Sequence, residues 1–112
     1  MKIKYNSIKV KDIHQSVKFY HDILKLEILD EYYSENMSVV MLTDGNIKLE
    51  LIADSTCEYG LDNIGFAVDN MDVVLKDLRD NDIHFNEELC TKDNHIISLE
   101  DCDGVKINII KE

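Results

Sequence analysis

Two short apolar runs around a tight turn occur twice in this sequence, 58 residues apart. In the second copy, residues 96–110, the turn is Asp101-Cys102-Asp103-Gly104. An aspartate there can hydrogen-bond its own backbone, and glycine accepts a positive φ. In the first copy, residues 39–52, the turn contains Asp44-Gly45-Asn46. Apolar and polar residues alternate after each turn, as in a strand with one buried face, so both stretches predict a β-hairpin.

The same separation extends into the segments before the hairpins. An opening strand is followed by an apolar stripe at helical spacing, with Asp12 as N-cap in the first copy and Asn70 or Asp69 in the second. Leu26 matches Ile83 at an offset of 57, which predicts a one-residue difference in the helix-to-strand loop. Self-similarity kept in type and order indicates a duplicated unit. The predicted order of elements in each unit is β-α-β-β-β.

With 112 residues the chain is long enough for one domain but not for two independent ones. The predicted fold class is α+β, with two tandem βαβββ modules forming curved mixed sheets around a concave cavity. We expect a single domain over residues 1–112, with the first module at about 1–56 and the second at about 60–112. One such unit cannot bury a sheet face alone. The two modules must pack together within one chain or swap between chains, and both alternatives stay open.

The charge balance narrows the class of partner. The chain carries 23 acidic and 12 basic residues, for a formal net charge of −11. A phosphate polymer would be repelled, so we expect no nucleic-acid partner, whereas a neutral or cationic small ligand is compatible. No apolar run approaches the ~18 residues of a membrane span, and the N-terminus lacks a signal-peptide core. Three cysteines (Cys57, Cys90 and Cys102) without C-x-x-C spacing fit a reducing compartment, so we expect a cytoplasmic protein with no membrane partner.

Three segments together are similar to the vicinal oxygen chelate superfamily, which includes glyoxalase I, extradiol dioxygenases, fosfomycin-resistance enzymes and bleomycin-resistance proteins. Residues 10–26 resemble the motif V-x-D-x-x-x-S-x-x-F-Y followed by L-G-L, although Lys25 stands in place of the glycine. Residues 64–70 carry the second match. Residues 101–108 resemble D-P-D-G-x-x-I-E, with Cys102 in place of the proline. The resemblance covers essentially the whole chain and implies the glyoxalase/bleomycin-resistance/dioxygenase fold.

In metal-dependent members the resemblance places ligands on the first, fourth, fifth and eighth strands. The corresponding residues here are Tyr5, Glu50, Asn63 and Asn108. Only Glu50 is a metal-ligating residue of the family's kind, and a phenol and two amides make a weak set for a transition metal. We therefore expect no metal and no cofactor, with these four residues lining a ligand site. Glu50 is the only candidate acid or base, and its alternative role is a surface carboxylate paired with Lys48 or Lys106.

Two functions are compatible with this site. The first is a metal-independent small-molecule binding protein of the bleomycin-resistance type, a homodimer that sequesters a cationic or aromatic ligand and is not an enzyme. Tyr32, Tyr33 and Tyr59 are candidates for an aromatic wall. The alternative is a metal-dependent lyase or dioxygenase of the glyoxalase I type, with a divalent metal held by an altered ligand set that includes Glu50. This set requires another ligand, either His95 or a residue from a partner chain. A regulatory module that keeps only the fold is a third possibility.

Overall fold

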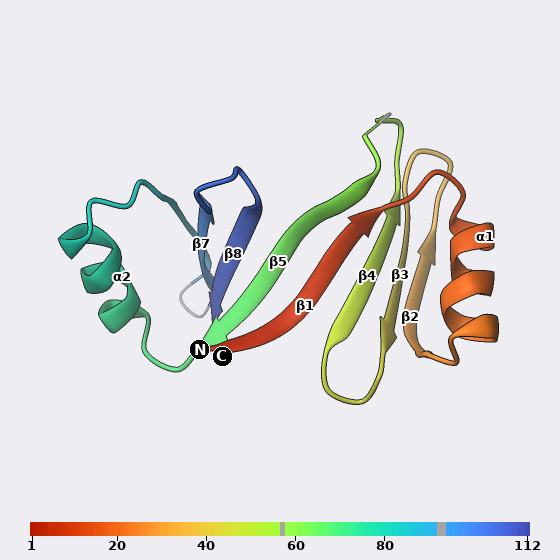
Figure 1. The fold of residues 1–112 in the computed structure, drawn as a ribbon, viewed down its shortest axis with the longest axis horizontal. Coiled ribbons are helices and arrows are strands. Elements are labelled where there is room, and N and C mark those ends of the chain that lie inside the picture. The colour runs from red at the N-terminus through yellow and green to blue at the C-terminus, as the bar shows by residue number, and fades with distance from the viewer. Residues whose placement is uncertain (57, 92–93) are drawn as a thin grey trace. The chain divides into compact units, whose positions relative to one another are not determined.

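The computed structural model describes residues 1–56, 58–91 and 94–112 of the chain (Figure 1). It divides into two compact units, residues 5–62 and residues 1–4 together with 63–112. The elements of the first module are β1 (Lys2–Lys9), α1 (Ile13–Val17) continued by the π-helical segment η1 (Lys18–Ile23), β2 (Glu27–Tyr33), β3 (Ser38–Thr43) and β4 (Lys48–Ala53). Those of the second are β5 (Gly60–Val68), α2 (Met71–Asp80), β6 (Asn86–Thr91), β7 (Asn94–Glu100) and β8 (Lys106–Lys111). In the described ranges, no helix combines the length and apolar character that crossing a bilayer requires.

The order of elements confirms the predicted fold class of two βαβββ modules. The strand order in the first module is β2-β3-β4-β1, and in the second it is β6-β7-β8-β5. In each module the opening strand pairs in parallel with the closing strand, and the remaining pairs are antiparallel. The strand pairing within each module is therefore mixed, as the sequence pattern predicts.

The strand register repeats the 58-residue offset seen in the sequence. In the first module Ser7 lies opposite Glu50 in the β1–β4 ladder. In the second module Gly65 lies opposite Asn108 in the β5–β8 ladder. Each position of the second pair lies 58 residues after its counterpart, so the predicted duplication holds at the level of individual ladder pairs.

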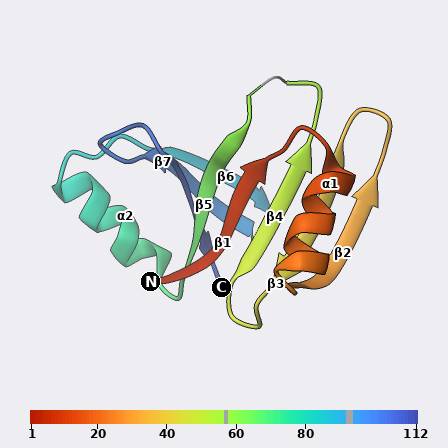
Figure 2. The same cartoon turned by 45° about the vertical axis from the view of Figure 1, so that its right-hand side comes forward.

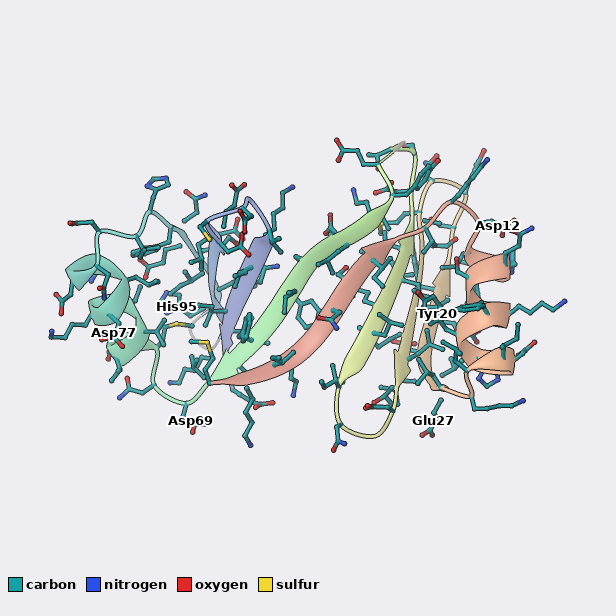
Figure 3. The ribbon with its side chains drawn as sticks, viewed as in Figure 1. Asp12, Tyr20, Glu27, Asp69, Asp77 and His95 are labelled. Carbon is teal, nitrogen blue, oxygen red and sulfur yellow. The ribbon has the colours of Figure 1, made fainter. Side chains whose placement is uncertain are left out.

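Each sheet buries the face that its helix covers. The first core contains the buried side chains Ile13, Val40, Leu42 and Leu51. The second core contains Val68, Met71, Leu75, Ile97 and Ile109. Figure 2 shows α1 lying across the sheet of the first module, and Figure 3 shows Tyr20 on the side of the helix that faces this sheet. Because side chains alternate along a strand, the residues between these core positions lie on the opposite side, which we call the helix-free face.

The two helices begin in the same way. Asp12 accepts hydrogen bonds from the backbone N–H groups of His14 and Gln15, which confirms it as the N-cap. Asn70 accepts from two backbone N–H groups of the following turn in the same manner. Of the two predicted caps for the second helix, the structure uses Asn70 rather than Asp69.

The two helices end differently, and the expected position of the one-residue difference is wrong. In the first module the backbone N–H of Leu26 donates to the carbonyl of Tyr20, six residues earlier. In the second, Ile83 donates to Leu78, five residues earlier. The additional residue is taken up by the π-helical turn of η1 rather than by the loop, because a π turn accommodates one residue more than an α turn.

Candidate functional site

Glu50 lies on the helix-free face of the first module. Its neighbours along β4, Leu49 and Leu51, belong to the core on the other side of the sheet. Ser7 on β1 is fully buried, with 0% of its surface exposed, and its hydroxyl donates a hydrogen bond of 2.9 Å to Oε1 of Glu50. The carboxylate is thus held by a buried hydroxyl and not by Lys48, with which it forms no ion pair within the described residues.

Asn63 and Asn108 lie together on the helix-free face of the second module. The amide Nδ2 of Asn108 donates to Oδ1 of Asn63 at 3.3 Å. Oδ1 of Asn108 in turn accepts from the hydroxyl of Ser98 on β7 at 3.0 Å. The amide oxygen of each asparagine therefore already accepts a hydrogen bond.

Tyr5 lies on β1, two residues before Ser7 and on the same helix-free face. It is half-buried and lies opposite Lys48 in the β1–β4 ladder. The structure therefore brings Tyr5 and Glu50 to one face of the first module and brings Asn63 and Asn108 into contact in the second. That these four residues bind one ligand stays a prediction.

The residues present do not fit a tightly bound transition metal. Across the part of the chain that the structure describes, no three His, Cys, Asp or Glu side chains lie together as a ligand set. The predicted donors supply one carboxylate, which accepts from Ser7, and two amide oxygens that accept from Asn108 and Ser98. Zinc, nickel, iron and manganese are held by imidazoles, thiolates and several carboxylates, and this set offers one carboxylate only.

His95 lies on the wrong face of its sheet to serve as an additional ligand. It is two residues before Ile97 on β7, and Ile97 is fully buried in the core that α2 covers. Strand alternation places His95 on that same helix-covered side, where Figure 3 labels it. Its Nε2 lies 2.7 Å from Oε1 of Glu87 on β6. The expectation that His95 joins Glu50 in a ligand set is therefore wrong.

The three tyrosines predicted to form an aromatic wall do not lie on one face of the sheet. Tyr33 stacks on the ring of His14, with 5.6 Å between ring centroids, so it faces the helix. Partial desolvation, and then the hydrogen bond from its hydroxyl to Glu31, raise the pKa of Tyr33. Tyr32 has the opposite orientation and is 57% exposed, and Tyr59 is 55% exposed. Only Tyr32 is thus placed on the helix-free face by strand alternation.

A cavity of about 440 Å³ lies at the N-terminal end of α1 in the first module. A second cavity, of about 570 Å³, lies in the second module. The residues that line the larger cavity include Phe85, Ser98, Leu99 and Cys102, whose free thiol is exposed. Its volume is in the range of small-molecule sites. Of the other cysteines, Cys57 lies outside the described residues, and the side chain of Cys90 is not described.

Neither Ser7 nor Ser98 is among the residues predicted from sequence. Each lies on a strand at the alternation expected for the helix-free face, which is the only signal the sequence offers. Ladder register is what makes them partners of Glu50 and Asn108. That register becomes visible only in the folded sheet.

A family model described as the Glyoxalase/Bleomycin resistance protein/Dioxygenase superfamily matches residues 2–109. The chain belongs to this superfamily, which confirms the resemblance seen in its motifs. No curated protein sequence matches the chain.

Solved structures with a similar fold include a hypothetical protein from Bacillus halodurans C-125, with 18% identity and a TM-score of 0.78 over 99% of this chain and 94% of that one. Methylmalonyl-CoA epimerase from Mycobacterium tuberculosis has 18% identity and a TM-score of 0.75 over 98% and 87% of the two chains. A Streptomyces coelicolor methylmalonyl-CoA epimerase variant, in complex with 2-nitronate-propionyl-CoA, has 20% identity and a TM-score of 0.73 over 100% and 94%. At such identities the likeness concerns the fold alone.

Proposed function

We propose that this protein is an acid–base enzyme of the isomerase or lyase type, in which Glu50 moves a proton of a small organic substrate. The observation that carries the proposal is the 2.9 Å hydrogen bond from the fully buried Ser7 to Glu50 on the helix-free face. The epimerases among the structural neighbours support catalysis better than sequestration. One of them is bound to a nitronate of propionyl-CoA, which resembles a substrate that has lost a proton next to its carbonyl group.

Ser7 gives the two carboxylate oxygens different tasks. Its hydroxyl donates to Oε1, while Oε2 accepts no hydrogen bond from the described residues. Oε2 is then the atom that removes a proton from the carbon next to a carbonyl group. The C–H bond breaks, its electron pair moves onto the carbonyl oxygen to form an enolate, and Glu50 returns a proton to the carbon. Such general-base catalysis contributes about 10²–10⁴-fold in rate, and no step requires a metal.

Exchange of substrate hydrogen with solvent tests this function. The protein is incubated in deuterated buffer with methylmalonyl-CoA or with the hemithioacetal of methylglyoxal and a thiol, and loss of the C–H signal is followed by proton NMR. We expect exchange that survives EDTA and falls by about 10²–10⁴-fold in Glu50→Gln. Glu27→Gln on β2 is the matched control and should leave the rate unchanged. Equal exchange in Glu50→Gln and wild type would exclude Glu50 as the base.

Metal-independent binding without turnover is the second candidate, favoured by a ligand set that does not fit a metal and by the net charge of −11. In this case a homodimer sequesters a cationic or aromatic compound. A compound present at about 100 times its Kd would raise the free energy of unfolding by about 2.7 kcal/mol. Thermal-shift screening against cationic, aromatic and anionic compounds, with light scattering for the dimer, measures both properties. A stabilising compound recovered unchanged after incubation would favour this candidate over the enzyme.

The metal-dependent form of the enzyme makes a separate prediction. Protein purified without chelator would contain stoichiometric metal, and EDTA would abolish exchange. Elemental analysis measures the content directly. From the donor set we expect substoichiometric metal. We place the reaction in the cytoplasm, which localisation of the tagged full chain would check.

A further inference from the structure

We propose that Lys48 supplies the positive charge of the Glu50 site and binds an anionic group of the substrate. This inference rests on the proposed function and assigns a second residue to the same site. Lys48 thereby fills the electrostatic role for which the described residues offer no fitting metal ligand set. The substrate is accordingly a carbon acid that carries a carboxylate, or that develops an oxyanion as its proton leaves.

Strand geometry places Lys48 beside Glu50. The two residues are separated by one position on β4, and Leu49 between them belongs to the core that α1 covers. Residues i and i+2 of a strand point to the same side, with Cα atoms about 6.6 Å apart. The ammonium and carboxylate groups therefore share the helix-free face, at a spacing that a small molecule can bridge.

Lys48 is also available for a ligand. Lys9, the other lysine of this face, is bound 3.2 Å from Asp54 and donates to Thr56 at 3.4 Å. Lys48 is exposed, and within the described residues it forms no ion pair. Glu50 forms no direct ion pair with it within those residues, and Oε1 of Glu50 accepts from Ser7 instead. A base and a cation thus lie side by side without a direct ion pair between them.

Apart from Glu50, no carboxylate of the described residues lies next to Lys48 in the ladder. Its ladder neighbours are Tyr5 on β1 and Thr43 on β3, neither of which carries a charge near neutral pH. The hydroxyl of Thr43 donates to the backbone carbonyl of Ile47. The nearest acid of the same ladder row is Glu27, opposite Thr43 on β2. Two strand spacings separate Glu27 from Lys48, about 10 Å, a distance at which exposed charges are largely screened.

The proposed proton transfer is favoured by a positive charge at this place. When Glu50 removes a proton, the electron pair of the C–H bond moves onto the adjacent carbonyl oxygen and leaves an oxyanion. A fixed cation near that oxygen stabilises the transition state more than the ground state. A metal ion does this as a Lewis acid, and an ammonium group does it by a charge-assisted hydrogen bond. A metal ion must be held by several protein ligands, whereas the ammonium group of Lys48 is part of the chain.

The second module contains a natural control. Lys106 lies 58 residues after Lys48, opposite Asn63 in the ladder just as Lys48 lies opposite Tyr5. Its neighbour two residues on is Asn108 instead of a glutamate. Lys106 therefore has the strand position of Lys48 without a glutamate two residues on, although Glu100 of β7 lies opposite it in the ladder. Lys106→Gln thus removes a lysine charge at the matching strand position.

Two measurements on the full chain test the role of Lys48. In the first, the 15N-labelled protein is titrated with methylmalonate and with its neutral dimethyl ester. We expect methylmalonate to shift the amide signals of β4, and its Kd to rise roughly threefold to tenfold in Lys48→Gln. Lys48→Arg should retain binding, because it keeps the charge. Lys106→Gln should match wild type, and the ester should be insensitive to every substitution.

The second measurement is the deuterium exchange assay with the same variants. We expect Lys48→Gln to lower kcat and Lys48→Arg to restore part of it, with unchanged thermal midpoints because Lys48 is exposed. Equal binding of acid and ester, equal effects of Lys48→Gln and Lys106→Gln, or no shift at β4 would each overturn the proposal. If methylmalonate binds through Lys48 but no exchange occurs, the proposed enzyme function fails while this site stands. If exchange is unaffected in Lys48→Gln, this site fails and the enzyme stands.

Discussion

The two modules share a backbone plan and differ in the chemistry on their helix-free faces. In the first, a buried serine binds a carboxylate across the parallel ladder, Ser7 to Glu50. In the second, the equivalent ladder pair is Gly65 and Asn108, and the amide takes its partners from Ser98 and Asn63. One ladder thus presents a carboxylate and the other an amide. The duplication preserves where side chains point, while the residue at each place decides what the face can do.

The helix ends give a second contrast between the modules. In η1 the N–H of Leu24 donates to the carbonyl of Phe19, five residues earlier, as in a π-helix. In α2 the equivalent bond from Asn81 reaches Asp77, four residues earlier. Both helices are followed by a residue with positive φ, Lys25 at 66° and Asp82 at 55°. The additional residue changes the turn but preserves the conformation that ends the helix.

If the two cores are equivalent, matched truncations should cost similar free energy. Leu51 and Ile109 lie 58 residues apart, with exposures of 0% and 4%. We expect Leu51→Ala and Ile109→Ala each to lower the free energy of unfolding by about 2–5 kcal/mol, from lost burial and the cavity left behind. Urea denaturation followed by circular dichroism measures both. A large loss at one position and none at the other would show that only one module has a cooperative core.

The N-caps should give smaller and parallel effects. Asp12→Ala and Asn70→Ala each remove the acceptor for two backbone N–H groups. We expect each to cost about 0.5–2 kcal/mol of stability, measured as a shift in the urea midpoint. Asp69→Ala, beside the second cap, is the control and should change little. If Asp69→Ala costs as much as Asn70→Ala, the cap assignment in the second module is wrong.

Glycine substitutions at the two helix ends should change stability by different amounts in the two modules. The left-handed conformation costs most side chains about 1–2 kcal/mol, but aspartate tolerates it better than lysine. Glycine relieves this strain but loses more conformational entropy on folding, which offsets part of the gain. We therefore expect Lys25→Gly to raise the free energy of unfolding by about 0.5–1 kcal/mol and Asp82→Gly to change it less. Lys25 is also the position where the superfamily motif has glycine. Thermal unfolding of both variants measures this, and a loss at Lys25 would contradict the strain explanation.

Acid should weaken the first module through two aspartates. Hydrogen bonds from the backbone N–H groups of Ile47 and Asn46 lower the pKa of Asp44. The side chain and backbone of Thr56 lower the pKa of Asp54 in the same way. A lowered folded-state pKa adds stability above the unfolded value, near 3.9, and this stability disappears as the pH falls through the folded-state value.

Asp44→Asn keeps the acceptor oxygen of the turn and removes the titrating group. We expect its urea midpoint to fall less than that of wild type between pH 6 and pH 3, a range that brackets the unfolded-state value. Asp69→Asn, outside the turn, serves as the control. A pH dependence in Asp44→Asn identical to wild type would show that Asp44 does not contribute to it.

The prediction from sequence works best where local patterns decide the structure. The alternation after Asp44-Gly45 and Asp103-Gly104 predicts hairpins, and Asp12 is identified as a cap by its position before an apolar stripe. The prediction that His95 reaches the Glu50 site is wrong because the sequence of a strand does not show which of its two faces packs against the core. A shift of one residue exchanges the two faces of a strand. Ile97 in the buried core settles the orientation against that expectation.

The sequence by itself determined the duplicated βαβββ plan and its superfamily. Hydrophobic period, turn residues and caps act within a few residues of chain, so they can be recognised without any folded neighbour. Only the tertiary structure decided that Ser7 holds Glu50, that Ser98 and Asn63 hold Asn108, and that His95 faces the helix. These pairings depend on ladder register between segments distant in the chain, and register is set by the whole sheet packing against its core.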